Sequence, residues 1–239
     1  MNEGRPGGRS WGMSVKMTSK LLQTFVCLTS IAVAVWGMAQ EMKVQSILGR
    51  TWLDRITLLT EAGEGVSTGL SARTIRNLVS ACAEMRARAP ALRGDAELRS
   101  RFAQTCASIA EEVLDRAPTH ARSLAMALLM APTMTPVQLA QAQTAAPHEP
   151  WPMQIRLWAL AETGALDADL LAVAAADFDR ALATDWGRTL LARLYVSRED
   201  ARPAILARAE TADARAQRAF LNAVALEQRG GRALDFTRG

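Results

Sequence analysis

The chain has 239 residues, 49% of them hydrophobic, and a formal net charge of +4. This length accommodates one ordinary domain, or one domain and an anchor, and the apolar fraction excludes a chain that is disordered throughout. The positive charge is concentrated near the amino terminus, where Arg5, Arg9, Lys16 and Lys20 oppose only Glu3. The remaining chain is nearly neutral and has no cluster of basic and aromatic residues, so we expect no nucleic-acid partner.

An uncharged apolar segment, residues 21–39, follows the basic amino-terminal tail, residues 1–20. As a helix it would be about 28 Å long, close to the hydrocarbon thickness of a bilayer. The positive-inside rule predicts a single-pass transmembrane anchor in the inner (cytoplasmic) membrane, with a cytoplasmic tail and a periplasmic carboxyl-terminal domain. The small residues of Gly37–Ala39 leave a cleaved signal peptide as the alternative.

Apolar residues recur at helical spacing beyond this segment, from Val44 to Leu59. The pattern predicts one continuous helix over about residues 19–60, whose second part would be a stalk. The glycine-rich run Glu61–Gly69 predicts a hinge after that helix. Residues 40–70 are therefore expected to form a stalk and a linker.

Two cysteines, Cys82 and Cys106, lie on the apolar stripes of two expected helices, which are separated by a break at Pro90–Gly94. Each lies 12 residues from Gly94. In an antiparallel helical hairpin both would lie about 18 Å from the turn, at the same level and on facing surfaces. This geometry predicts a disulfide, which an extracytoplasmic compartment permits, and two buried free thiols are the alternative.

Residues 71–230 are predicted to form a helical domain, followed by a frayed tail, residues 231–239. Alanine and leucine dominate the domain, and caps, proline first turns and glycines divide it into short helices. A stiff proline connector is expected over residues 147–152. The predicted fold class is therefore all-α, and it consists of an amino-terminal transmembrane helix followed by a helical-hairpin solenoid or a bundle. The expected helices are 71–88, 95–116, 118–130, 135–144, 153–163, 168–183, 186–196, 201–211 and 213–229.

The run Leu114–Leu124 contains Arg-Ala-Pro at the point where one expected helix ends and the next begins. Residues Ala174–Ala181 have the pattern Ala-x3-Phe-x2-Ala. The first motif resembles the junction between two tetratricopeptide repeats, where one helical hairpin ends in a proline turn and the next begins. The second resembles the small–large–small packing pattern of that family's second helix. The Ala-Pro pairs recur 28 and 29 residues apart rather than about 34, and Trp186 takes the closing proline position. Over roughly residues 71–229 the resemblance implies a protein-binding scaffold.

Glu111, Glu112 and Asp115 form an acidic cluster on one expected helix. Such a pair of carboxylates could act as general acid and base if one were desolvated, and a solvated helix face is the alternative. The sequence has no nucleophile, phosphate-loop or zinc-protease motif. We therefore expect no enzyme, no catalytic residue and no cofactor.

Other polar candidates have structural explanations. Asp167 is expected to cap a helix, and His120 and His148 are expected at the surface or at caps, beside proline turns. Aspartates two residues apart point in different directions on a helix, so we expect no metal site. The aspartates considered for that site are Asp167, Asp169, Asp177 and Asp179.

Trp151, Trp158 and Trp186 could line a groove for a peptide or a sugar, and contacts within the core are the alternative. Together these features predict a membrane-anchored extracytoplasmic helical-repeat scaffold whose partners are envelope or membrane proteins of a bacterium. One alternative is an accessory factor in envelope polysaccharide assembly that contacts a glycan or a synthase through the tryptophans. The other is an all-α enzyme built on carboxylates.

Overall fold

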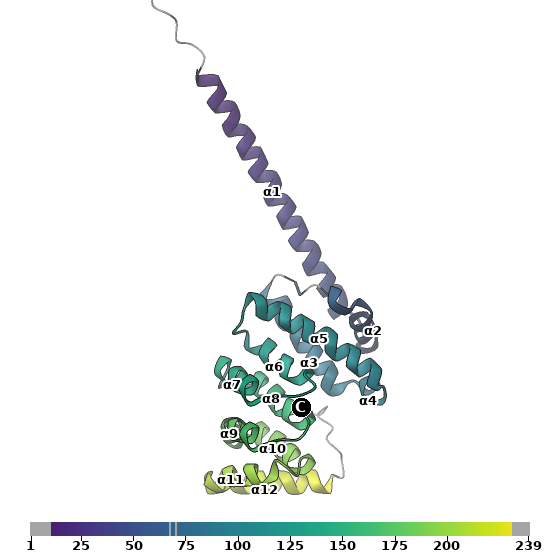
Figure 1. Ribbon diagram of the computed structural model, residues 1–239, viewed down its shortest axis with the longest axis vertical. Coiled ribbons are helices and arrows are strands. Elements are labelled where there is room, and N and C mark those ends of the chain that lie inside the picture. The colour runs from purple at the N-terminus through teal and green to yellow at the C-terminus, as the bar shows by residue number, and fades with distance from the viewer. Residues whose placement is uncertain (1–10, 67, 70, 231–239) are drawn as a thin grey trace, which may run out of the picture.

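The computed structural model describes residues 11–66, 68–69 and 71–230, and the expected tail, residues 231–239, lies outside them. Every regular element of the described residues is helical, which confirms the predicted all-α class. A long helix, α1 (Trp11–Leu48), projects from a domain of shorter helices (Figure 1). The elements of the domain are α2 (Trp52–Ala62), the short 3-10 helix η1 (Gly63–Gly65), α3 (Ala72–Arg88), α4 (Pro90–Gly94), α5 (Ala96–Arg116), α6 (Ala121–Met130), α7 (Pro136–Ala145), α8 (Pro150–Glu162), α9 (Ala168–Leu182), α10 (Asp185–Ser197), α11 (Arg202–Thr211) and α12 (Ala214–Arg229).

Side-chain caps explain where most of these helices begin. The Ser71 hydroxyl accepts the backbone N–H of Thr74 at 3.1 Å, and Asp95 accepts that of Leu98 at 2.9 Å. At the start of α7, Thr135 forms a capping box, in which the Gln138 side chain accepts the Thr135 N–H at 3.0 Å. Each cap satisfies a backbone donor that has no partner within the helix.

The predicted continuous helix over residues 19–60 is wrong. The structure ends α1 at Leu48 and begins α2 at Trp52. Thr51 caps the new helix, because its hydroxyl accepts the backbone N–H of Asp54. A threonine that bonds a neighbouring N–H offers the backbone an alternative to continuing the first helix. The helix α2 then ends at Ala62, and the next residue, Gly63, has a φ of 54°, which favours glycine.

The predicted connector over residues 147–152 is also partly wrong, because α8 begins within it, at Pro150. Both Pro150 and Pro152 lie in the first turn of this helix. A proline costs little there, since the N–H that it lacks would have no partner within the helix.

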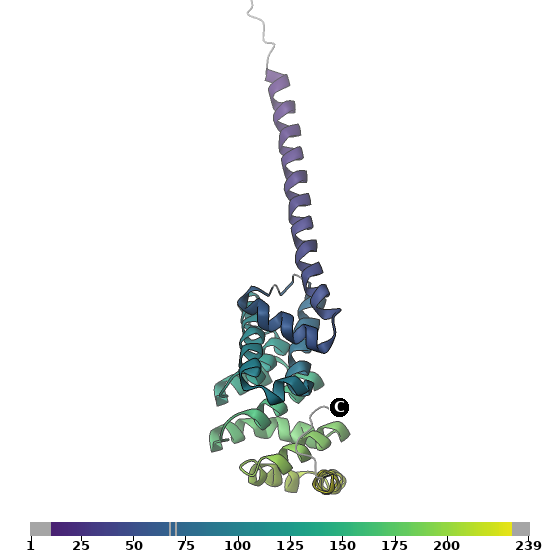
Figure 2. The ribbon, with the colours of Figure 1, turned by 90° about the vertical axis from the view of Figure 1, so that its right-hand side faces the viewer.

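Contacts between helices arrange the domain in two rows. In the first row α6, α8, α10 and α12 follow one another, each packed on the next. In the second row α9 packs on both α7 and α11. Figure 1 shows the rows stacked away from α1, with α11 and α12 at the far end, and Figure 2 shows the same stack from the side. One hydrophobic core runs through the stack, from Val44 in α1 to Val224 in α12.

Over Leu22–Leu48, α1 is long and apolar enough to cross a membrane. Its large apolar side chains from Leu22 to Met38 are exposed, and none of them packs on the domain. The last turns of α1 differ, because Val44 is fully buried and both Ile47 and Leu48 pack against the core. The apolar part that projects from the domain therefore matches the segment predicted as the anchor.

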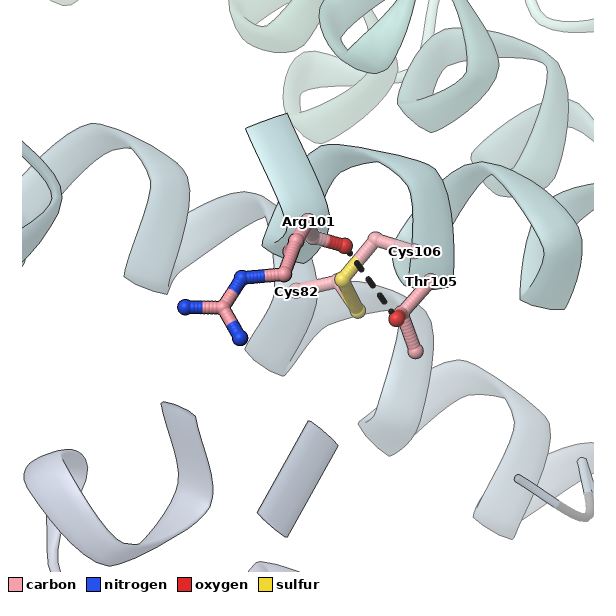
Figure 3. The surroundings of a disulfide bond; sticks show 4 residues. All are labelled: Cys82, Arg101, Thr105 and Cys106. Atoms are coloured by element: carbon pink, nitrogen blue, oxygen red, sulfur yellow. Dashed lines mark hydrogen bonds between the residues drawn. A yellow bond between two sulfur atoms is a disulfide. The ribbon is translucent and has the colours of Figure 1, made fainter. Parts of the chain in front are cut away.

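The predicted disulfide between Cys82 and Cys106 is present (Figure 3). It joins α3 to α5, with the two Cα atoms 5.9 Å apart, and both residues are fully buried. In Figure 3 the bond lies beside the turn of α5 in which the Thr105 hydroxyl donates to the Arg101 carbonyl at 3.2 Å. The disulfide thus links the two helices where the sequence predicted it, with the two cysteines at the same distance from the turn between the helices.

A buried ion pair links α7, α8 and α9, which lie farther from α1. Arg156 of α8 donates from Nε and Nη2 to the two carboxylate oxygens of Asp177 in α9, both at 2.8 Å. Both side chains have no exposed surface. Gln143 of α7 donates to the same carboxylate at 3.0 Å, and Arg156 also donates to the carbonyl oxygens of Ala142 and Ala146. Nearly every polar atom of the pair is therefore satisfied, which a buried charge requires.

Candidate functional site: the α5–α8 cleft

A cleft of about 570 Å³ lies between α5 and α8 and extends over one end of α6. We call it the α5–α8 cleft. The α5 residues that line it recur every three to four positions and so occupy one face of that helix. These residues are Arg99, Ser100, Ala103, Gln104, Ala107 and Glu111.

Small side chains account for the hollow. Ala103 and Ala107 of α5 lie among the lining residues with Ala127 of α6 and Ala159 of α8. An alanine presents only a methyl group, so helices packed through alanine leave space that a larger side chain would fill. The edges of the cleft are polar, because Gln104 and Gln138 bring amide groups that can both donate and accept hydrogen bonds.

An ion pair between Arg86 of α3 and Glu162 of α8 lies at one side of the cleft. Both side chains are mostly buried, with 17% and 29% of their surface exposed. Burial raises the pKa of Glu162, while the guanidiniums of Arg86 and Arg99 act in the opposite direction. Burial likewise lowers the pKa of Arg86. The pair thus fixes the end of α8 to α3 beside the opening of the cleft.

The three carboxylates of the predicted acidic cluster do not converge on one site. Glu111 lines the α5–α8 cleft, whereas Asp115 lines a different hollow beside Pro118. Glu112 is 3.0 Å from the Arg116 guanidinium and accepts a hydrogen bond from Thr68 at 2.8 Å. The cluster therefore provides no pair of facing carboxylates for acid–base chemistry.

The four aspartates considered as metal ligands have separate structural roles or positions. Asp167 caps α9 as predicted, by accepting the Leu170 N–H at 2.7 Å, and Asp169 lies in the first turn of the same helix. Asp177 belongs to the buried ion pair, and Asp179 pairs with Arg208. Among the described residues, no group of three or more histidine, cysteine, aspartate or glutamate side chains could hold a metal ion.

The tryptophans do not form the groove that the sequence allowed. Trp158 is 3% exposed and is part of the hydrophobic core, so a ligand cannot reach it. Trp151 packs partly against that core, and its ring lies under the guanidinium of Arg122, 4.6 Å from the ring centroid. Trp186 is 37% exposed. A glycan-binding surface formed by all three is therefore excluded, because one of them lies in the core.

The glycine-rich segment expected to form a hinge is held against α5. Val66 and Thr68 are buried. Thr68 donates to Glu112, and Arg116 donates to the Gly69 carbonyl oxygen at 3.2 Å. The described part of the linker is thus packed on the domain instead of being free to swing.

Sequence reasoning missed the α5–α8 cleft, although α5 carries a signal for it. Phe102, Cys106 and Ile109 form its buried stripe, and the alanines at 103 and 107 lie beside that stripe on an adjoining face. Small residues next to a core stripe indicate a face that another chain can approach closely.

Comparisons of this chain with protein-family models, with curated proteins and with solved structures found no match.

Proposed function

We propose that this protein is a membrane-anchored scaffold that binds a segment of another envelope protein in the α5–α8 cleft. The cleft itself carries the proposal, because about 570 Å³ lies within the usual range of binding pockets. Its alanine floor permits close approach of a peptide backbone. The amides of Gln104 and Gln138 at its edges offer that backbone both donors and acceptors.

The order of the helices supports a helical-hairpin solenoid similar to tetratricopeptide repeats. Two rows in which alternate helices pack on one another are typical of such stacks, and the surfaces between their repeats commonly bind partners. The predicted hairpin junction Leu114–Leu124 runs from the end of α5 into α6. In the predicted packing pattern of α9, the residues Ala174, Phe178 and Ala181 are all buried.

The membrane part of the proposal places residues 21–39 in the inner membrane, residues 1–20 in the cytoplasm and the domain in the periplasm. The exposed apolar side chains of α1 and the basic residues before them support this orientation. The disulfide is compatible with an oxidising compartment. An anchor would confine the cleft to the membrane surface and raise its effective concentration towards partners in the same membrane.

Site-specific photocrosslinking in native membranes tests the proposal. The full-length chain would carry benzoylphenylalanine in place of Gln104, an exposed residue that lines the cleft. We expect a discrete adduct with one protein, identified by mass spectrometry. The same probe in place of Gln228, exposed on α12 at the far end of the stack, provides the control.

A second substitution makes the test specific to the cleft. Ala107→Leu, introduced into the Gln104 probe chain, adds bulk to the alanine floor, and leucine is well tolerated in a helix. We expect the adduct to disappear while the domain remains folded. An adduct that persists in the Ala107→Leu chain, or that also forms from position 228, would overturn the proposed binding site.

A further inference from the structure

A second cleft, independent of the proposed protein-binding site, lies where α3 meets the beginning of α6. Its volume is about 560 Å³, and we call it the α3–α6 cleft. Arg76 of α3 lines it, together with His120 and Arg122 at the start of α6 and Glu149 just before α8. Three of these four side chains can carry a positive charge.

Neither arginine of the α3–α6 cleft forms an ion pair with a carboxylate of the described residues, although Glu149 acts electrostatically on Arg122. Arg76 is exposed, and no carboxylate of the described residues lies within ion-pair distance of it or of Arg122. Arg122 is held in position instead, because it donates to the Ser80 hydroxyl at 3.0 Å and lies over the Trp151 ring. A guanidinium has five N–H donors, which leaves donors free on both residues.

His120 contributes a third donor. Its Nδ1 accepts the backbone N–H of Ser123 at 3.3 Å and so caps α6. A neutral imidazole that accepts at Nδ1 carries its proton on Nε2, where the N–H remains available to a ligand. Burial lowers the pKa of His120, and the positive charges of Arg122 and Arg76 lower it further, while Glu149 acts in the opposite direction. The cleft therefore has an excess of positive charge at the position of the imidazole.

We propose that the α3–α6 cleft binds a phosphate group. A phosphate monoester has three terminal oxygens and a charge of about −1.5 to −2 at neutral pH, which suits three donor groups, two of them permanently charged. Arginine is well matched to phosphate because its planar N–H groups contact two oxygens at once. The single carboxylate, Glu149, does not balance two guanidiniums. The phosphate belongs either to a soluble molecule or to a lipid headgroup.

The test uses the full-length chain in maltoside micelles, which contain no phosphate, and inorganic phosphate as the probe in isothermal titration calorimetry. We expect saturable binding, weakened about tenfold or more by Arg76→Gln and by Arg122→Gln, since each removes a charge-assisted hydrogen bond. Arg73→Gln is the matched control, because Arg73 is exposed on the same helix and is not among the lining residues. Glu149→Gln should strengthen binding, since it removes the one carboxylate among the described residues that line the cleft.

Proton NMR of His120 gives a readout that a purely structural role of the arginines would not change. A bound phosphate should raise the His120 pKa towards its ordinary value, because it offsets the charges of Arg122 and Arg76.

A second experiment adds vesicles that contain phosphatidic acid. If they displace the bound inorganic phosphate, the ligand is a lipid headgroup, and if they leave it bound, the ligand is a soluble molecule. No saturable binding below about 10 mM, or equal losses in Arg73→Gln and Arg76→Gln, would overturn the proposal.

Discussion

Two regions of this protein are held together by different chemistry. In the part nearer the start of the chain, α1 to α5, which we call the proximal part, a disulfide joins α3 to α5. There the Glu41 carboxylate of α1 also accepts the Ser71 N–H at the start of α3 at 2.6 Å. In α7 to α9, which we call the distal part because it lies farther from α1, the pair of Arg156 and Asp177 is a fully buried polar link. A covalent bond constrains the unfolded chain, whereas a buried ion pair is favourable only while both partners remain. The two parts should therefore respond to different perturbations.

The largest effect is expected in the distal part, from Asp177→Ala. The substitution leaves the Arg156 guanidinium buried without its counter-charge, which typically costs about 3–5 kcal/mol of unfolding free energy. Urea unfolding of the micelle-bound chain, followed by circular dichroism, measures this loss. Asp179→Ala is the matched control, because it removes a neighbouring aspartate whose ion pair with Arg208 is exposed to solvent, and it should change the stability far less.

A paired substitution separates the loss of the charges from the loss of the ion pair. Arg156→Met with Asp177→Leu removes both charges and keeps an apolar core, so it should cost less than Asp177→Ala alone. Some loss should remain, because the carbonyl oxygens of Ala142 and Ala146 also lose their donor. A double variant as unstable as the single one would show that the stability of the distal part does not depend on charge pairing.

An intermediate effect is expected in the proximal part when the disulfide is removed. The bridged residues are 24 positions apart, and a loop of that size corresponds to about 3.5 kcal/mol on the chain-entropy model. Cys82→Ala with Cys106→Ala should lower the urea midpoint by a corresponding amount, and a reducing agent should then have no further effect. If a reductant leaves the wild-type midpoint unchanged, the bond does not contribute to stability in solution.

The smallest effect is expected for Glu41→Gln. The amide oxygen can still accept from Ser71, but the charge assistance is lost, which should cost about 1 kcal/mol. Hydrogen exchange at the first turn of α3 should speed up, while exchange in α9 should not change. Glu61→Gln, an exposed residue on α2, is the control. Faster exchange throughout the domain in Glu41→Gln would contradict a purely local link.

The sequence predicted most of the helices because their ends depend on local chemistry. The caps at Ser71, Asp95 and Thr135 use residues within three positions of the helix start, and the cap expected at Asp167 forms in the same way. The disulfide was also predictable, because equal distances from one turn place both cysteines at the same level of a hairpin. The prediction failed at Thr51 and at Pro150, because each of these residues begins a helix, Thr51 as its cap and Pro150 in its first turn.

The buried ion pair was not predicted because it depends on packing between helices that are distant in sequence. Arg156 and Asp177 are 21 positions apart, and no local pattern pairs them. One signal was present, since Asp177 lies on the stripe that Leu170, Ala174 and Phe178 bury in α9. A charged residue at a core position implies a buried partner. The α5–α8 cleft was not predicted for a related reason, because its volume depends on how side chains of helices distant in sequence pack together.

The junction between α1 and the domain has a consequence for bilayers of different thickness. Because Val44 is buried and Glu41 is bonded to the start of α3, α1 and the domain should move as one body. A transmembrane helix responds to a thinner bilayer by tilting. If residues 21–39 cross the membrane as proposed, the same tilt would rotate the whole domain, and with it the angle at which the α5–α8 cleft faces its neighbours. The lipid composition of the host membrane would then help to determine which partners this protein can reach.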